Sequence, residues 1–242
     1  MTGSTSTKVD LQAFSRLNEP MLLRVGQDSL RGGDIARYAS RFDLLELNAE
    51  RGQIPRLATL HRWREQVPRQ LVFSVTLGSR VGRLDDGVEL ESDLESALRA
   101  VQVLAARWVV LQTGPTVTPS QRNRRRLEAV VARLPRESCR LAWEPRGLWE
   151  PEQQEEVCAS LGMTLVRDLR RCELPRGPVA YTRLRALGAG ARFSTEAAEV
   201  VAERAAGLDE LYVVIEGQGA RNGAEVLRRL LIGEVSQPNL VD

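Results

Sequence analysis

Short apolar runs alternate with longer amphipathic segments along most of this chain. The runs are nearly continuous in valine, leucine, isoleucine and aromatic residues, which is typical of parallel β-strands covered on both faces. The pattern therefore predicts eight strands, at residues 21–26, 43–48, 71–77, 107–113, 139–144, 163–167, 178–184 and 210–216.

The segments between these runs have the spacing of amphipathic helices. In ESDLESALRAVQVLAA, residues 91–106, apolar side chains recur every three or four positions and form one stripe. Ser92 and Glu95 fit a capping box that would start this helix. Another helix is predicted to begin with Ser194 as its N-cap. The alternation thus predicts a helix after each strand.

Strands that alternate with helices indicate βαβ units and a parallel sheet. Eight such units in about 220 residues favour a single TIM-type (β/α)8 barrel, which we place at residues 19–235. A flexible lead-in, 1–18, and a C-terminal tail, 236–242, would flank it. A doubly wound open sheet is the alternative fold. The loop after the first strand, GQDSLRGG, lacks the GxGxxG spacing that would favour that alternative.

Composition narrows the class of protein. The chain has 34 basic and 32 acidic residues, a net charge of +2, which favours neither a nucleic acid nor a membrane surface as a partner. The polar start and the absence of a long apolar stretch lead us to expect a cytoplasmic protein. Three cysteines without metal spacing and the single histidine, His61, predict no cofactor. The sequence does not set the oligomeric state.

Five segments, in order, resemble one known family. They are FDLLELNA, LHRWREQVPRQLVFSVTL, LAWEPRGLW, PVAYTRLRALG and ELYVVIEGQGARNGAEVLRRL, and the resemblance runs over most of the chain, from about Leu22 to Leu231. Together they resemble the YecE-like family, a domain of unknown function, number seventy-two. The resemblance implies a TIM-type barrel and a site at one end of it, but no assigned reaction.

The chain departs from the family pattern at several positions. Gly147 and Arg185 stand where the resemblance implies histidines, Thr76 stands in place of a lysine, and Glu216–Gly217 replaces a pair of asparagines. If the family's activity depends on those groups, this chain has lost it. We therefore interpret the chain as a divergent member.

Polar residues close most of the predicted strands. In a TIM barrel the carboxyl ends of the strands carry the site, so these residues are the candidates. Glu144 is the candidate catalytic residue, and the candidate binding residues are Glu46, Asn48, Arg146, Arg183, Glu216 and Trp149. Trp149 would either stack on a ligand or pack in the core.

The arginines of the seventh strand raise the question of how the charges pair. We expect Glu144 and Arg183 to lie within salt-bridge reach in the lumen, either as part of a site or as a structural ion pair. Arg183 is also a candidate binder of an anion or carboxylate. Arg185 is expected to point to the opposite face and to stabilise a loop.

The leading functional hypothesis is a barrel that binds a small polar or anionic ligand at its C-terminal face, with hydrolase or lyase activity as one interpretation. A catalytically degenerate barrel that acts as a binding or interaction protein is the first alternative, because a carboxylate without a proton-transfer partner is a weak catalyst. The second alternative is a Mg²⁺- or Mn²⁺-dependent sugar or phosphodiester enzyme that uses Glu144, Asp168 and Glu216. The arginines nearby argue against the metal.

Overall fold

The chain folds as a closed barrel of eight parallel strands, in which each strand pairs with the next and β8 pairs with β1. The computed structural model describes residues 21–30, 33–49, 54–85, 87–173, 177–185 and 193–233. The predicted lead-in and tail lie outside these ranges. The strands are β1 (Leu22–Gln27), β2 (Leu44–Asn48), β3 (Val72–Thr76), β4 (Trp108–Thr113), β5 (Arg140–Pro145), β6 (Thr164–Arg167), β7 (Val179–Arg185) and β8 (Glu210–Glu216). All eight predicted strands are confirmed, with ends that differ by at most one residue.

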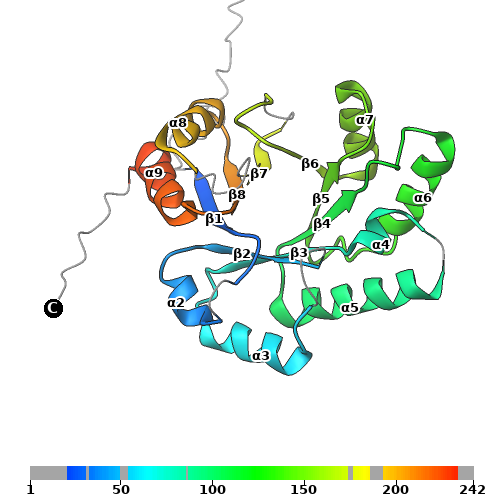
Figure 1. Cartoon of the computed structure of the whole chain (residues 1–242), viewed down its shortest axis with the longest axis horizontal. Coiled ribbons are helices and arrows are strands. Elements are labelled where there is room, and N and C mark those ends of the chain that lie inside the picture. The colour runs from blue at the N-terminus through cyan, green and yellow to red at the C-terminus, as the bar shows by residue number, and fades with distance from the viewer. Residues whose placement is uncertain are drawn as a thin grey trace, which may run out of the picture.

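Helices surround the barrel (Figure 1). They are α2 (Ile35–Ala39), α3 (Leu57–Gln66), α4 (Ser79–Gly82), α5 (Val88–Leu104), α6 (Gln121–Val131), α7 (Pro151–Leu161), α8 (Thr195–Arg204) and α9 (Ala220–Ile232). Between β6 and β7 the described residues contain no helix, so the prediction of a helix in every unit is wrong there. The connection, 168–178, only just reaches the ~10–12 residues that a crossover with a helix needs.

Two helix starts test the predicted caps. Helix α5 begins at Val88, a full turn before Ser92, and no side chain caps it, so the predicted capping box is wrong. The cause is Leu90, which is buried and extends the apolar stripe toward the N-terminus. The N-cap of α8 is confirmed, since the side chain of Ser194 accepts a hydrogen bond from the backbone N–H of Ala197.

Alternating side chains divide each strand between the helices and the lumen. The outward side chains join the large apolar core beneath the helices. The lumen holds a separate apolar cluster: Leu44, Trp108, Val110, Ala142, Val166, Tyr181, Tyr212 and Val214. Trp108 lies edge-on to both tyrosines, with ring centroids 5.3 and 5.1 Å apart. The middle of the barrel is therefore filled by side chains.

An ion pair closes the N-terminal end of the lumen. Arg140 donates to both carboxylate oxygens of Glu210 at 2.8 Å, and the hydroxyl of Tyr212 donates to the same carboxylate at 2.7 Å. The guanidinium of Arg140 also lies 5.7 Å from the centroid of Trp108, within cation–π range. With this end occupied and the middle filled, the C-terminal end is the part of the lumen where a ligand could enter.

The hydroxyl of Tyr38, from α2, links β1 to β2 where the barrel closes. It accepts the backbone N–H of Gln27 at 2.8 Å and donates to the carbonyl of Leu44 at 2.6 Å. Burial raises the pKa of Tyr38 far above its ordinary value, so the phenol stays neutral and keeps its proton for this bond. The bridge joins the last residue of β1 to the first residue of β2, and it holds this seam of the barrel together.

Candidate functional site

Arg183 is the centre of a buried charge network at the C-terminal end of the lumen. Its Nε donates to Oε2 of Glu144 at 2.9 Å, and its Nη2 donates to Oε2 of Glu46 at 2.7 Å. Its Nη1 contacts Glu46 and also lies 3.3 Å from Oε1 of Glu216. The predicted pair of Glu144 and Arg183 is therefore confirmed. The network joins β2, β5, β7 and β8, because the ends of these strands meet at the barrel mouth.

Most donors of Arg183 are already engaged by these carboxylates. Its side chain is only 1% exposed, and all three of its nitrogens have a carboxylate partner. A guanidinium held in this way has little capacity left for a second anion. The geometry therefore gives little support to Arg183 as a direct binder of an anionic ligand and indicates that it positions the carboxylates around it.

Arg185 joins the same network, which corrects the expectation that it faces away. It hydrogen-bonds Oε1 of Glu144, and its Nε lies 3.5 Å from Oε1 of Glu216. The reason is the period of a strand: residues two apart, such as Arg183 and Arg185, share a face. The side chain of Arg185 is 36% exposed, so it is the more accessible of the two guanidinium groups.

Glu144 is held as an anion. Burial raises the pKa of its carboxyl, but the charges of Arg183 and Arg185, a hydrogen bond from Gln112 and the charge of Arg146 outweigh burial and lower the pKa below its ordinary value. The Gln112 amide lies 2.6 Å from Oε2 of Glu144. Glu144 is thus ionised at neutral pH, which suits electrostatic binding better than proton donation.

Glu46 is a second carboxylate that binds Arg183, and it links the network to Tyr181. The hydroxyl of Tyr181 donates to its Oε2 at 2.6 Å, and Ser74 lies 3.0 Å from the same hydroxyl. Burial and the charge of Glu46 raise the pKa of Tyr181 well above its ordinary value, so the phenol is neutral. Glu46 itself is fully buried and contacts Arg183 and Tyr181, which indicates a structural role for its carboxylate.

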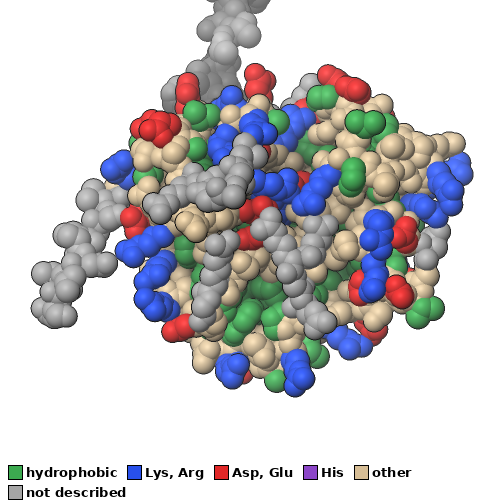
Figure 2. Space-filling view, in the orientation of Figure 1, with side chains coloured by type: hydrophobic (Ala, Val, Ile, Leu, Met, Phe, Trp, Pro, Cys, Tyr) green, Lys and Arg blue, Asp and Glu red, His purple; other side chains and the backbone are tan. Residues whose placement is uncertain are grey.

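Three other predicted site residues lie around this network. Arg146 is exposed, and its Nη2 donates to Oε1 of Gln112 at 3.0 Å, so it approaches Glu144 through that amide. Glu216 is buried and faces Arg183 and Arg185. Asn48 ends β2 two residues after Glu46, on the lumen side. In Figure 2, acidic and basic side chains lie together near the centre of the face in view.

Trp149 does not join the site. It is 5% exposed, its ring packs edge-on against Trp143 at 5.0 Å, and its Nε1 donates to the carbonyl of Val117 at 2.6 Å. Trp143 alternates with Glu144 along β5 and therefore points outward, so Trp149 lies outside the barrel wall. Of the two interpretations of Trp149, packing is the one that its position supports.

A cavity of about 210 Å³ opens at the mouth beside β1 and β2. Asp28 and Asn48 contribute polar groups to it, and Trp63 and Ile54 contribute apolar surface. Its volume is below the ~300–1,000 Å³ that is usual for drug-sized ligands, so it suits a small molecule.

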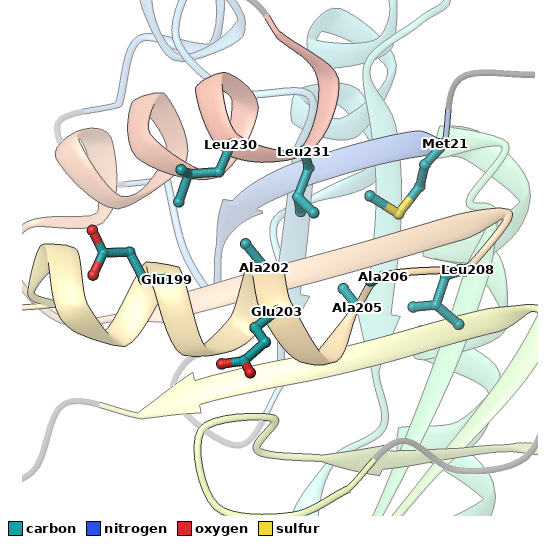
Figure 3. Close-up of a pocket in the computed structure, with 10 residues that line it drawn as sticks. Met21, Glu199, Ala202, Glu203, Ala205, Ala206, Leu208, Leu230 and Leu231 are labelled. Atoms are coloured by element: carbon teal, nitrogen blue, oxygen red, sulfur yellow. The ribbon is translucent and has the colours of Figure 1, made fainter.

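A larger hollow of about 500 Å³ lies at the opposite end of the strands, between α8 and α9 (Figure 3). Met21, Leu208, Leu230 and Leu231 give it an apolar lining, with Glu203 among its few polar side chains. This lining offers little for polar recognition, so the mouth cavity is the candidate site.

The carboxylates proposed for a divalent cation do not fit that role. Glu144 and Glu216 contact Arg183 and Arg185. Oδ1 of Asp168 accepts a hydrogen bond from Nε of Arg170 at 2.8 Å. Guanidinium donors therefore occupy the oxygens that a cation would need. Within the described ranges, no group of three or more His, Cys, Asp or Glu residues is arranged to hold a metal ion.

Two residues of the network, Tyr181 and Ser74, and one residue of the cavity, Asp28, were missed in the sequence. Tyr181 and Ser74 lie two residues before Arg183 and Thr76, and Asp28 lies two after Gly26. The strand period of two, applied backwards from each polar strand end, would have placed Tyr181 and Ser74 in the lumen.

Among the residues that the structure describes, no helix has the length and apolar character needed to cross a membrane.

The fold has close counterparts among solved structures. A DUF72 family protein from Enterococcus faecalis V583 is 17% identical, with a TM-score of 0.68 over 91% of this chain and 100% of that chain. Another, from Thermotoga maritima MSB8, is 20% identical, with a TM-score of 0.64 over 86% of this chain and 99% of that chain. A D-psicose 3-epimerase, solved in the presence of D-fructose, is 14% identical, with a TM-score of 0.56 over 88% of this chain and 100% of that chain. At these identities the likeness concerns the fold alone.

The family follows from the sequence match. No curated protein matches this chain. A family model described as "Protein of unknown function DUF72" matches residues 26–237, which is most of the chain. The resemblance to the YecE-like family is thereby confirmed, and the chain belongs to the DUF72 family.

Proposed function

We propose that this barrel binds a small polar ligand at its C-terminal mouth, in the cavity lined by Asp28, Asn48 and Trp63. The observation that carries the proposal is the position of this cavity, directly beside the Glu46–Arg183 network at the end of the strands that TIM barrels use for their sites. The polar side chains would accept and donate hydrogen bonds, and the tryptophan would cover an apolar face of the ligand.

An anionic group on the ligand would lie toward Arg146 and Arg185. These two guanidinium groups are the accessible ones near Glu144, whereas Arg183 is enclosed by carboxylates. Asp28 would repel an anion on its side of the mouth. The arrangement therefore supports a ligand whose uncharged polar part lies in the cavity and whose negative group, if it has one, lies toward β5 and β7.

Binding without chemistry is better supported than hydrolase or lyase activity. Such reactions need a group that releases and recovers a proton near neutral pH. The lowered pKa of Glu144 and the raised pKa of Tyr181 keep both groups in one protonation state there. This favours a barrel that has kept a binding site, and a metal-dependent reaction has no support from the paired carboxylates.

The test is binding measured by calorimetry and thermal unfolding with four probes: D-fructose, D-sorbitol, inorganic phosphate and D-fructose 6-phosphate. D-fructose is a suitable first probe because a barrel of the same fold was solved in its presence. A probe at about 100 times its Kd should add about 2.7 kcal/mol to the free energy of unfolding.

Two asparagine variants locate the site. Asn48→Ala should weaken binding, because Asn48 lines the cavity. Asn123→Ala is the matched control, since Asn123 lies on α6 and hydrogen-bonds the carbonyl of Thr118. No binding by any probe, or equal binding by the wild type and Asn48→Ala, would contradict the proposal.

A further inference from the structure

The hydroxyl of Thr76 is buried at the barrel mouth and has no hydrogen-bond partner within the described part of the chain. The residue is 0% exposed and ends β3. A buried hydroxyl without a partner costs free energy, whereas valine would fill the same space without that cost. An unsatisfied polar group next to a candidate site is therefore a reason to ask what it binds.

Thr76 faces the lumen on β3, next to the strand that carries Asn48, and is not itself among the residues that line the cavity. Ser74, two residues earlier on β3, reaches Tyr181 across the lumen, so Thr76 points to the same side. Thr76 pairs with Asn48 in the β2–β3 register, and neighbouring strands lie ~4.8 Å apart. Asn48 lines the cavity, so a group that enters past it would come close to the Thr76 hydroxyl.

Thr182 shows how a buried threonine in this barrel is normally satisfied. Like Thr76 it is a 0% exposed strand residue, on β7. Its hydroxyl donates to the carbonyl of Arg167 at 2.7 Å and accepts the N–H of Leu169 at 3.2 Å. The contrast between the two threonines lies in their hydrogen bonds, since burial is the same.

We infer that Thr76 and Asn48 form a subsite that recognises hydroxyl groups, and that the ligand is a polyhydroxylated small molecule such as a sugar or polyol. This inference rests on the proposed function and adds the ligand class to it. A threonine hydroxyl and an asparagine amide both donate and accept, which matches a ligand hydroxyl. Asp28, which also lines the cavity, would accept from a further hydroxyl.

The experiment compares Thr76→Val, Thr76→Ser and Thr182→Val with the wild type. Calorimetry with D-fructose and D-sorbitol measures affinity, and urea denaturation measures stability. Thr76→Val should bind the polyol about tenfold more weakly, with a urea midpoint equal to or above that of the wild type. Thr76→Ser keeps the hydroxyl and should retain affinity. Thr182→Val should lower the urea midpoint and leave affinity unchanged.

The outcomes separate this inference from the proposed function. If a polyol binds and Thr76→Val binds it as tightly as the wild type, the subsite is wrong and the mouth site stands. If inorganic phosphate binds and neither polyol does, the ligand class is wrong. If none of these probes binds the wild type, both proposals fail. A lower urea midpoint for Thr76→Val would show that the hydroxyl is already satisfied in the free protein, which also overturns the inference.

Discussion

Arg183 and Glu144 form a salt bridge across the barrel mouth, with Nε 2.9 Å from Oε2 and side-chain exposures of 1% and 8%. The pair joins β7 to β5, two strands that are not neighbours in the sheet. Because Glu46 and Glu216 contact the same guanidinium, Arg183 ties together the ends of four strands. Its first role is thus to hold the mouth in shape, with the cavity beside it.

Replacing Arg183 should strongly destabilise the barrel. Arg183→Met leaves Glu46, which is fully buried, without its bidentate partner, and breaking a buried ion pair costs ~3–5 kcal/mol. Urea denaturation would measure the loss. Arg221→Met is the matched control, because the Arg221–Glu225 pair lies on the surface of α9 and should be worth less than ~1 kcal/mol. Equal losses for the two variants would contradict a structural role for Arg183.

Acidification should remove the contribution of Glu144. Its folded-state pKa is lowered, so the stabilisation is fully present above the unfolded pKa of ~4.3 and is lost as the pH falls through the lower, folded value. Glu144→Gln should therefore be less stable than the wild type at pH 7, and the gap should narrow below about pH 4. Urea titrations at pH 7 and pH 3 test this. A gap that stays constant or widens on acidification would rule out an ionised, paired Glu144.

The strands could be predicted from the sequence, whereas the partners of Arg183 could not. Apolar runs report burial on both faces, and all eight strands follow from them. The pairing of Arg183 with Glu46 depends on how far the strands are staggered around the barrel, which no local pattern records. The side of β7 on which Arg185 lies could also be predicted, because residues two apart on a strand share a face. The expectation that Arg185 faces away from Arg183 did not follow this rule and was therefore wrong. The cavity depends on loops, whose shapes leave little periodic signal.

Arg185→Ala should cost about 1 kcal/mol, more than a typical surface substitution. Hydrogen bonds to charged groups contribute ~1.5–3 kcal/mol, and the 36% exposure of Arg185 reduces that through solvent screening. Arg83→Ala is a suitable control, since Arg83 pairs with Asp85 and both side chains are at least half exposed. Chemical denaturation of both variants gives the comparison. A loss below ~0.5 kcal/mol for Arg185→Ala would mean that its contacts with Glu144 and Glu216 do not stabilise the fold.

Gly26→Ala should prevent proper closure of the barrel. Gly26 lies opposite Leu44 where β1 meets β2, and a Cβ added there would lie 1.6 Å from the Leu44 carbonyl oxygen. That oxygen already accepts the hydroxyl of Tyr38, so the backbone cannot shift without breaking the bridge between the strands. The β1–β2 register has two paired positions, and the backbone N–H of Asp43 donates to the carbonyl of Val25 at 3.0 Å beside them, so the seam is short.

The size of the effect distinguishes a backbone clash from the general cost of removing a glycine. Overpacking costs ~1–3 kcal/mol where side chains can yield, and a backbone carbonyl yields less, so we expect a loss above ~3 kcal/mol or an unfolded chain for Gly26→Ala. Gly114→Ala is the matched control, because a Cβ there meets nothing within 4 Å. Circular dichroism and urea denaturation of both variants give the result. If Gly26→Ala were as stable as Gly114→Ala, β1 and β2 would have to lie farther apart than the structure places them.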